Sequence, residues 1–296
     1  MKSFKIRQIS PDEISNIDPR PLYDGLETTV TKATYRPNEG FTAVAIKKIV
    51  LQEDYEQEKA IHSSLNHPHI LKLLGYIQTD VAFSLVTVLA TNGTLQEYLD
   101  KNSNDDRTQA TCLQYARDIA AAVRYLHSDS VKVLHGNLTP SNILALQDGT
   151  LVVADFGCGK KIPANQHSVL CGRYFGTEYY WPPEKAKIPK ESGEFTLAYD
   201  IYTLAWILYL LTTDNSTDPY ANMSDGTVST DDRVALHKEN KKPEIPDTPS
   251  TKKLATLIYS CMAGKPEERP TAAQVHEILK EPGIVFRPRG NTCGVQ

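Results

Sequence analysis

The sequence has few cysteines and no Cys-x-x-Cys pair at the spacing of a zinc site. Its first residues lack the apolar core of a signal peptide, and no later run is long enough to cross a bilayer. These absences predict a cytoplasmic protein with reduced thiols. The five cysteines are Cys112, Cys158, Cys171, Cys261 and Cys293.

A strong charge of either sign is also lacking. The chain has 32 lysines and arginines against 36 acidic residues, which gives a net charge of −4. Such a balance produces no general attraction to nucleic acid or to an anionic membrane, so neither is expected as a partner. With 296 residues, 40% hydrophobic and 23% charged, the composition is that of a soluble globular protein. The length allows one large domain or two lobes that share a cleft.

The first ninety residues alternate short β-like runs with turns. The stretches 44–46 and 83–89 are apolar and rich in β-branched residues, and a helix with amphipathic spacing is expected between them, from Asp54 to Leu65. Beyond the turn signal Asn92-Gly93 the pattern becomes mostly helical. The predicted fold class is therefore α+β, with a small β-rich lobe joined to a larger helical lobe.

Four helices are predicted in the second part of the chain. The segment 200–212 is apolar nearly all round, which is typical of a helix buried on every side. The polar stretch 214–232 is expected to be an exposed loop, and the end of the chain, 282–296, a flexible tail. The predicted helices are 111–127, 200–212, 252–261 and 271–279.

Five segments resemble, in order, the signature set of protein kinases. Any one of them is weak evidence, since an exposed strand lysine explains Val44-Ala45-Ile46-Lys47 equally well. The ordered set is specific, because Asp155-Phe156-Gly157 follows Asn142 at the interval that kinases use. The segments are 44–47, 58–70, 135–144, 155–157 and 176–184, the last paired with Arg269.

The resemblance covers about residues 20 to 280 and implies a bilobal kinase fold. It suggests an N-terminal extension at 1–19, a kinase-like domain at 20–281 and a C-terminal tail at 282–296. Within the domain, the smaller lobe would comprise 20–90 and the larger lobe 91–281.

The resemblance also implies a nucleotide site with ATP and Mg²⁺ as cofactors. Lys47 would hold the α- and β-phosphates, with Glu58 as its ion-pair partner, and Asn142 and Asp155 would bind the metal. Thr87 stands at the gatekeeper position before the hinge. The full set of nucleotide-side residues is Gly25, Val30, Ala45, Lys47, Glu58, Thr87, Leu89 and Leu144.

Other matching residues would have structural roles in the family. Glu184 would form an ion pair with Arg269, and Asp200 would brace the backbone of the catalytic loop. An internal spine would consist of Leu73, His62, Phe156 and His135.

The departures from the family pattern concern catalysis. Asn137 stands where kinases carry the catalytic aspartate, and an amide is not a base near pH 7. Thr139 replaces the lysine that steadies the γ-phosphate, and Gly136 replaces the arginine that can grip a phosphorylated activation segment. Only Gly25 remains of the three glycines in the phosphate-covering loop. The sequence is therefore identified as a pseudokinase of the Ser/Thr or tyrosine-kinase-like type.

Three functions remain open. The favoured one is a pseudokinase that binds ATP and works by binding or regulating a protein partner, because the pocket residues persist beside a missing base. The second is a scaffold that binds no nucleotide, which the eroded glycine loop supports. The third is a weak or unconventional phosphotransferase, since Lys47, Glu58, Asn142 and Asp155 could still assemble Mg·ATP.

Overall fold

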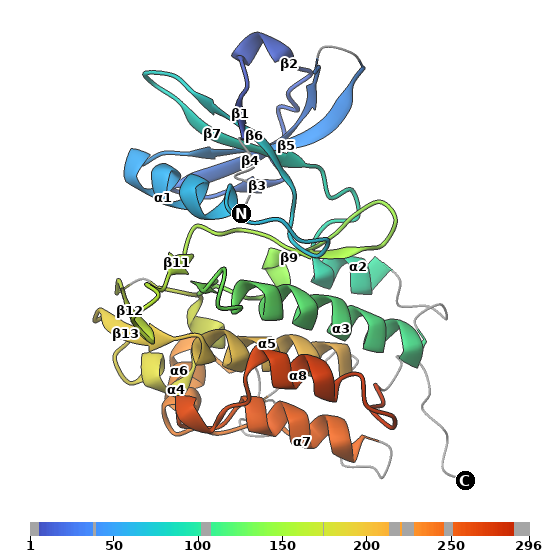
Figure 1. Ribbon diagram of the computed structural model, residues 1–296, viewed down its shortest axis with the longest axis vertical. Coiled ribbons are helices and arrows are strands. Elements are labelled where there is room, and N and C mark those ends of the chain that lie inside the picture. The colour runs from blue at the N-terminus through green and yellow to red at the C-terminus, as the bar shows by residue number, and fades with distance from the viewer. Residues whose placement is uncertain are drawn as a thin grey trace.

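The structure is a computed structural model, which describes residues 6–37, 40–101, 108–173, 175–212, 220, 228–245 and 251–286. Figure 1 shows two lobes: a curled β-sheet with one helix above, and a bundle of helices below. The predicted bilobal α+β kinase fold is confirmed. No helix in these parts of the chain combines the length and the apolar character that crossing a membrane requires.

The N-lobe contains a seven-stranded sheet in the order β1-β6-β7-β5-β4-β2, with β3 paired to β4. Its central strands place alternate residues on opposite faces, so that Val44 and Ile46 of β5 are buried on one face and Ile49 on the other. Helix α1 (Gln52–His62) packs against this sheet. The strands are β1 (Arg7–Gln8), β2 (Ile14–Ser15), β3 (Tyr23–Asp24), β4 (Thr28–Tyr35), β5 (Thr42–Ile49), β6 (Leu73–Gln78) and β7 (Phe83–Val88).

The sheet includes residues that the sequence placed in an N-terminal extension. Strand β1 pairs in parallel with β6, with Arg7 opposite Gly75, and β2 pairs with β4, with Ile14 opposite Tyr35. Ile9 is buried in the N-lobe core. Residues 7–15 are therefore structurally part of this lobe.

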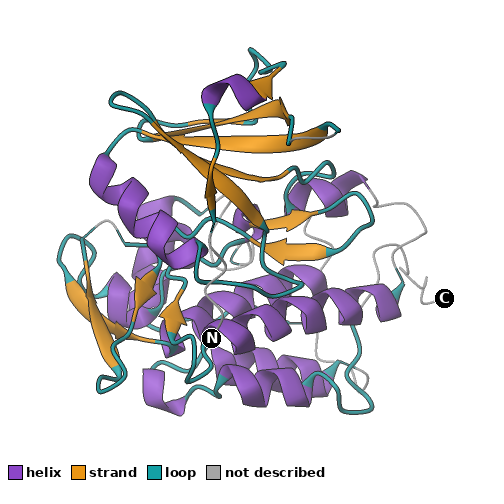
Figure 2. Ribbon diagram, turned by 45° about the horizontal axis from the view of Figure 1, so that its top comes forward, coloured by secondary structure: helices purple, strands orange, loops and turns teal. Residues whose placement is uncertain are grey.

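The C-lobe is built around α5, in which every residue from Tyr199 to Thr212 is buried. The main core cluster joins this helix to α3, α7 and α8. Figure 2 shows these helices stacked beneath the sheet of the N-lobe. The helices are α2 (Leu95–Lys101), α3 (Gln109–Leu126), α4 (Pro183–Ala186), α5 (Ala198–Thr212), α6 (Thr230–Lys238), α7 (Lys252–Cys261) and α8 (Ala272–Ile278).

Three small two-stranded sheets lie between the helices and shape the site. They carry the loops that follow the catalytic motifs, and all three are antiparallel. The pairs are β8 (Val133–Leu134) with β11 (Lys160–Lys161), β9 (Ile143–Ala145) with β10 (Leu151–Val153), and β12 (Ser168–Cys171) with β13 (Gly193–Thr196).

Two predictions for exposed segments need correction. The end of the chain was expected to be a flexible tail from residue 282, but Ile284 and Phe286 are buried in the main C-lobe core because their apolar side chains complete it. The stretch 214–232 was expected to be a loop, yet Ser229 caps α6 and residues 230–232 form its first turn. Residues 213–219, 221–227 and 287–296 lie outside the described residues.

Candidate functional site

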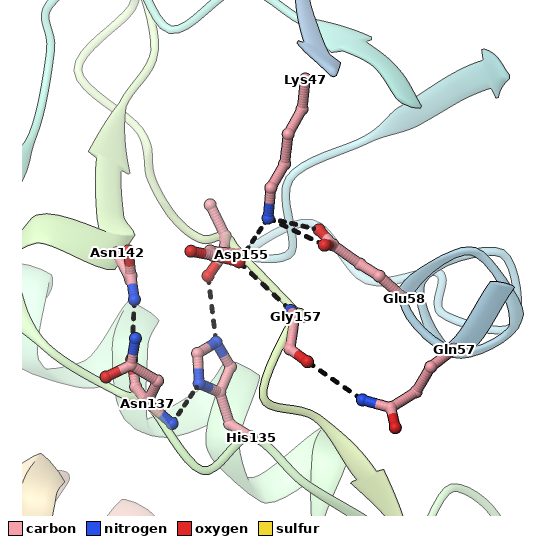
Figure 3. Close-up of polar contacts among 9 residues, drawn as sticks. Lys47, Gln57, Glu58, His135, Asn137, Asn142, Asp155 and Gly157 are labelled. Atoms are coloured by element: carbon pink, nitrogen blue, oxygen red, sulfur yellow. Dashed lines mark hydrogen bonds and ion pairs between the residues drawn. The ribbon is translucent and has the colours of Figure 1, made fainter. Parts of the chain in front are cut away.

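Lys47 lies between two carboxylates at the point where the two lobes meet. Strand β5 carries Lys47, α1 carries Glu58, and Asp155 follows β10, so three distant segments converge (Figure 3). The ammonium nitrogen of Lys47 donates to both carboxylate oxygens of Glu58, at 2.9 and 2.8 Å, and to Oδ1 of Asp155 at 2.6 Å. The predicted ion pair of Lys47 and Glu58 is thus formed, and Asp155 joins it.

Burial sets the electrostatics of this trio. Burial alone would lower the pKa of Lys47, but the attraction of Asp155 and Glu58 outweighs it and raises that pKa above its usual value. Burial raises the pKa of Glu58 to about 7, because the attraction of Lys47 offsets only part of the desolvation. Burial would also raise the pKa of Asp155, but Lys47 and the backbone N–H of Gly157 lower it overall. Asp155 therefore stays ionised at neutral pH beside a fixed cation.

The loop that carries Asn137 is held from below by Asp200. The Asp200 carboxylate accepts hydrogen bonds from the backbone N–H groups of His135, at 2.8 Å, and Gly136, at 2.9 Å. His127 contacts the same carboxylate at 2.9 Å. Asp200 is fully buried in the first turn of α5, so this brace is rigid. It performs the backbone-bracing role that the sequence predicts.

Asn137 is fixed on both its side chain and its backbone. Its side-chain oxygen accepts a hydrogen bond from the Thr177 hydroxyl at 2.7 Å, and its backbone carbonyl accepts one from the Asn142 amide at 2.8 Å (Figure 3). With the oxygen engaged by Thr177, the remaining polar group of Asn137 is an NH₂ donor. A donor cannot take a proton from a substrate hydroxyl.

Two supporting charges are absent where the sequence predicted their loss. Thr139 is buried, and its neutral side chain places no cation beside Asn137. Gly136 has a left-handed backbone, with φ of +74°, and a side chain at this position would overlap the ring of Phe175. The geometry of the loop is thus kept while its charges are gone.

Three aromatic rings, tilted against one another, form a column that joins the lobes. The ring of Phe156 lies 4.9 Å from that of His62 and 5.1 Å from that of His135, measured between ring centroids. His62 donates to the carbonyl of Leu71 at 2.7 Å, and burial lowers its pKa to about 4. Leu73, the other predicted member of this spine, packs with Ile49, Tyr55 and Leu85. His62 is therefore a neutral core residue.

The residues predicted to enclose an adenine lie on the strands around Lys47. Val30 of β4 is opposite Lys47 in the sheet register, and Thr87 of β7 is opposite Ala45. Leu144 of β9 and Val88 pack against the same small buried cluster, and Val88 precedes Leu89 at the link between the lobes. These residues fit an adenine ring: they are apolar or small, and they stand beside the lysine that would meet the phosphates.

Gly25 stands in the turn that joins β3 to β4. The Tyr23 ring folds over it, since a methyl group on Gly25 would lie 2.7 Å from the Tyr23 hydroxyl oxygen. Tyr23 and Thr28 occupy the positions where the kinase resemblance implies glycines. Gly25 is therefore the one glycine that the turn keeps at these three positions.

Asp155 and Asn142 supply oxygen atoms for a metal site. Side-chain oxygens and nucleotide phosphates are the ligands that Mg²⁺ prefers. Forty per cent of the Asp155 side chain is exposed, and its second carboxylate oxygen is not the one that Lys47 contacts. Within the described residues, no three His, Cys, Asp or Glu side chains form a metal cluster. The donor set fits a Mg²⁺ ion that arrives with a nucleotide, with Asp155 as the carboxylate ligand.

One contact at the site was missed from the sequence. Gln57, the residue before Glu58, donates to the carbonyl of Gly157 at 3.0 Å (Figure 3). It also accepts a hydrogen bond from Lys160. It ties α1 to the segment after Asp155 and so helps to keep Glu58 on Lys47. No sequence signal indicates this role, because a glutamine on an amphipathic helix is ordinary.

The ion pair predicted to close the activation segment is also present. Arg269 forms two parallel hydrogen bonds with the Glu184 carboxylate, at 2.7 and 2.6 Å. It also donates to the carbonyls of Ala263 and Ala198, each at 2.9 Å. The Arg269 side chain is fully buried, so this contact holds the segment onto the C-lobe core.

The sequence of this chain is similar to those of known proteins. The family model of the protein kinase domain matches residues 23–282. The chain is 28% identical over 282 residues to Serine/threonine-protein kinase 12 of Arabidopsis thaliana, which covers 92% of this chain and 57% of that protein. It is 27% identical to Serine/threonine/tyrosine-protein kinase HT1 of Arabidopsis thaliana. That match covers 78% of this chain and 55% of that protein.

A further relative is the EPD1-interacting receptor-like cytoplasmic serine/threonine-protein kinase 5D of Gossypium barbadense, at 26% identity over 83% of this chain and 55% of that protein. The chain thus spans little more than half the length of these relatives. The family model nevertheless covers most of the chain, including all of the site residues that the sequence predicted. On this match and on the geometry above, the chain belongs to the protein kinase family.

Proposed function

We propose that this chain is a catalytically impaired protein kinase that binds ATP between its lobes and acts in the cytoplasm by binding or regulating a signalling partner. The observation that carries the proposal is a contrast. Lys47, Glu58 and Asp155 are assembled for a nucleotide, whereas the position of the base is an amide whose oxygen is engaged by Thr177.

Each residue then has a defined task. Lys47 would hold the α- and β-phosphates, and Glu58 would keep Lys47 in place. Asp155 and Asn142 would hold Mg²⁺, which when bound neutralises phosphate charge. Asn137 would orient a substrate hydroxyl without accepting its proton. General base help is typically worth ~10²–10⁴-fold, so its loss would leave phosphate transfer feeble.

A thermal-shift titration with ATP, with and without Mg²⁺, tests the binding part. A ligand that binds only the folded chain stabilises it by ~2.7 kcal/mol at one hundred times its dissociation constant. We expect a shift in the wild type, a smaller one without Mg²⁺, and a loss of the Mg²⁺-dependent part in Asp155→Ala. No shift at millimolar ATP would favour the nucleotide-free scaffold instead.

A second candidate is a weak phosphotransferase with a Ser/Thr-type hydroxyl substrate. The assembled trio favours it, as do relatives named as serine/threonine kinases. Transfer of labelled phosphate from ATP to a protein substrate would reveal it, and Asp155→Ala should abolish the signal. Activity that survives this change would come from a contaminating kinase.

The partner part of the proposal needs its own test. If nucleotide gates partner binding, a double variant with Lys47→Met and Asp155→Ala should weaken capture of a partner identified with the wild type. The control is partner capture by the wild type with and without added ATP. Equal binding in all three cases would show that the fold serves as a docking surface independently of nucleotide.

A further inference from the structure

Phe175 fills the space above Gly136 in the catalytic loop. A Cβ atom added to Gly136 would overlap the Phe175 ring, and the φ of +74° at Gly136 is one that side chains rarely adopt. Phe175 is 4% exposed, stacks on Phe195 at 5.7 Å and meets Tyr199 edge-on at 5.1 Å. The packing of this aromatic side chain thereby anchors the activation segment, residues 155–184, to the C-lobe.

The packing of Phe175 sets the position of Thr177, the residue that contacts Asn137. The carbonyl of Phe175 accepts a hydrogen bond from the Trp181 indole at 2.9 Å, which closes the loop between them. Gly176 follows with φ of +74°, and a Cβ atom there would lie 2.9 Å from the Gly136 carbonyl. Thr177 then reaches Asn137 with its hydroxyl. The contact of Thr177 with Asn137 therefore depends on the position of the Phe175 ring against Gly136.

A lysine secures the first half of the activation segment. Lys132, at the turn before β8, donates from its ammonium group to the carbonyls of Ala164 at 3.0 Å and Gln166 at 2.8 Å, with Pro163 at 3.4 Å. Its own backbone carbonyl accepts from the Ile162 N–H at 2.9 Å. Hydrogen bonds from a charged donor are among the stronger ones, so this lysine folds the loop at 163–166.

A second lysine secures the far end. Lys185 is buried, and its ammonium group donates to the carbonyls of Arg173 at 2.8 Å and Glu191 at 3.0 Å, with Ile188 at 3.4 Å. It thus joins the activation segment to the chain that leads into β13. Between the two lysines, β12 pairs with β13 over four residue pairs.

Ser168 of the activation segment donates its hydroxyl to the Glu194 carboxylate at 2.7 Å, across the β12–β13 pair. A phosphate on Ser168 would face that carboxylate and be repelled by it. A phosphate at Ser168 would therefore weaken the contact between β12 and β13 at this position.

We propose that Phe175, Lys132 and Lys185 hold the activation segment in its folded arrangement without phosphorylation, and that Phe175 is the positioning residue that keeps Thr177 on Asn137. This arrangement belongs to the chain itself and does not depend on nucleotide binding. The protein would then present a permanently ordered activation segment. The Phe175 ring in this segment would leave no room for an arginine at position 136.

Hydrogen exchange on the full chain tests this directly. The protein is treated with phosphatase, its mass is checked, and backbone exchange is followed by mass spectrometry in peptides that cover 162–172 and 175–184. We expect these peptides to be protected at least about a hundredfold relative to an unfolded chain. Exchange at the unfolded rate, or protection that appears only after phosphorylation, would overturn the proposal.

Lysine variants locate the effect. Lys132→Met and Lys185→Met keep the stem of each side chain but remove the donor to three carbonyls. We expect exchange to rise about tenfold in 162–172 for the first variant and around 173 and 188–191 for the second. The exposed lysines Lys161 and Lys190 give the matched controls, Lys161→Met and Lys190→Met, which should stay within about twofold. Equal behaviour of tests and controls would remove the lysines from the proposal.

A reciprocal pair of variants tests the packing of Phe175 against Gly136. Phe175→Leu keeps an apolar side chain that is smaller than the ring, so it should fold but loosen 175–184 by about tenfold in exchange. Gly136→Arg should loosen the same peptides, because the arginine displaces the ring. The double variant with Gly136→Arg and Phe175→Leu should exchange less than the product of the two single effects, since the smaller leucine leaves more room for the arginine. Independent effects would show that Phe175 and Gly136 are not coupled.

Discussion

Thr177 donates its hydroxyl hydrogen to the side-chain oxygen of Asn137 at 2.7 Å. This one contact determines how Asn137 faces the site, because an amide whose oxygen is occupied presents its NH₂ group. The surrounding loop is otherwise well ordered: Asp200 holds its backbone and Asn142 holds the carbonyl of Asn137. The departure from the kinase pattern at Asn137 is therefore a local one, set in a loop that retains its support.

The first prediction concerns Asn137→Asp. A carboxylate at this position can still accept from Thr177, and it also supplies the missing base. We expect transfer of labelled phosphate from ATP to a protein substrate to rise by at least ~10²-fold over the wild type. The control is Asn137→Asp combined with Asp155→Ala, which should return to background. A variant no more active than the wild type would show that Thr139, Gly136 or the glycine loop limits the reaction.

The second prediction concerns Lys47→Met. Removing the ammonium group leaves the buried Glu58 carboxylate and the Asp155 carboxylate without their shared cation. Breaking a buried ion pair in this way typically costs ~3–5 kcal/mol. We expect a lower melting temperature and no stabilisation by ATP. Lys48→Met is the matched control, because Lys48 is the next residue on the same strand and is exposed. Equal effects of both variants would contradict the assembled trio.

The sequence predicted the parts of the site that depend on fixed spacing along the chain. Lys47, Glu58, Asn142 and Asp155 were identified because their separations match a family pattern, and the structure places them together or on adjacent segments. Helix α7 was predicted with its observed bounds, since an amphipathic stripe and clear end signals mark it.

Contacts that depend on tertiary packing were not predicted. Lys132 and Lys185 read as surface lysines, yet each has three backbone carbonyls around its ammonium group. Phe286 lies near the end of the chain, where polar neighbours suggested a tail, but the C-lobe core has room for its ring. No periodicity or motif marks such residues, because their partners are distant in the sequence.

The third prediction concerns Arg269→Ala. The Arg269 side chain is fully buried and donates to Glu184 and to two backbone carbonyls, so its loss leaves three acceptors without their donor. We expect the free energy of unfolding to fall by ~3–5 kcal/mol in urea denaturation.

Arg124→Ala serves as the control for this measurement. Half of the Arg124 side chain is exposed, and its contact with Glu277 is 3.7 Å long. Such surface pairs contribute ~0–1 kcal/mol. A loss in Arg269→Ala no larger than that of the control would contradict the view that the Glu184 pair fixes the end of the activation segment.

The fourth prediction concerns acid stability and His62. Burial lowers the pKa of His62 to about 4, whereas an unfolded histidine titrates near 6.5. Between these values the unfolded chain takes up a proton that the native His62 refuses, so stability is lost as the pH falls from about 6.5 to about 4. The contribution of this one residue is ~3 kcal/mol at most.

His62→Gln should reduce that loss, because glutamine keeps a donor for the Leu71 carbonyl but does not titrate. Urea denaturation at a series of pH values measures it. His135 and His237 still act in the same direction, since burial lowers both of their pKa values. Glu58 acts in the opposite direction, because its raised pKa favours the folded chain as the pH falls. This effect is common to the wild type and His62→Gln.

His167→Gln is the matched control, because it replaces an exposed histidine with the same residue, glutamine. Lys47, Asp155 and His135 surround His62 and remain in both variants, so the difference between the two profiles isolates His62. A His62→Gln profile that runs parallel to the wild type down to pH 4 would mean that native His62 accepts its proton as readily as the unfolded chain does. The ring column of His62, Phe156 and His135 would then be open to water, and the two lobes would lack the neutral core that joins them.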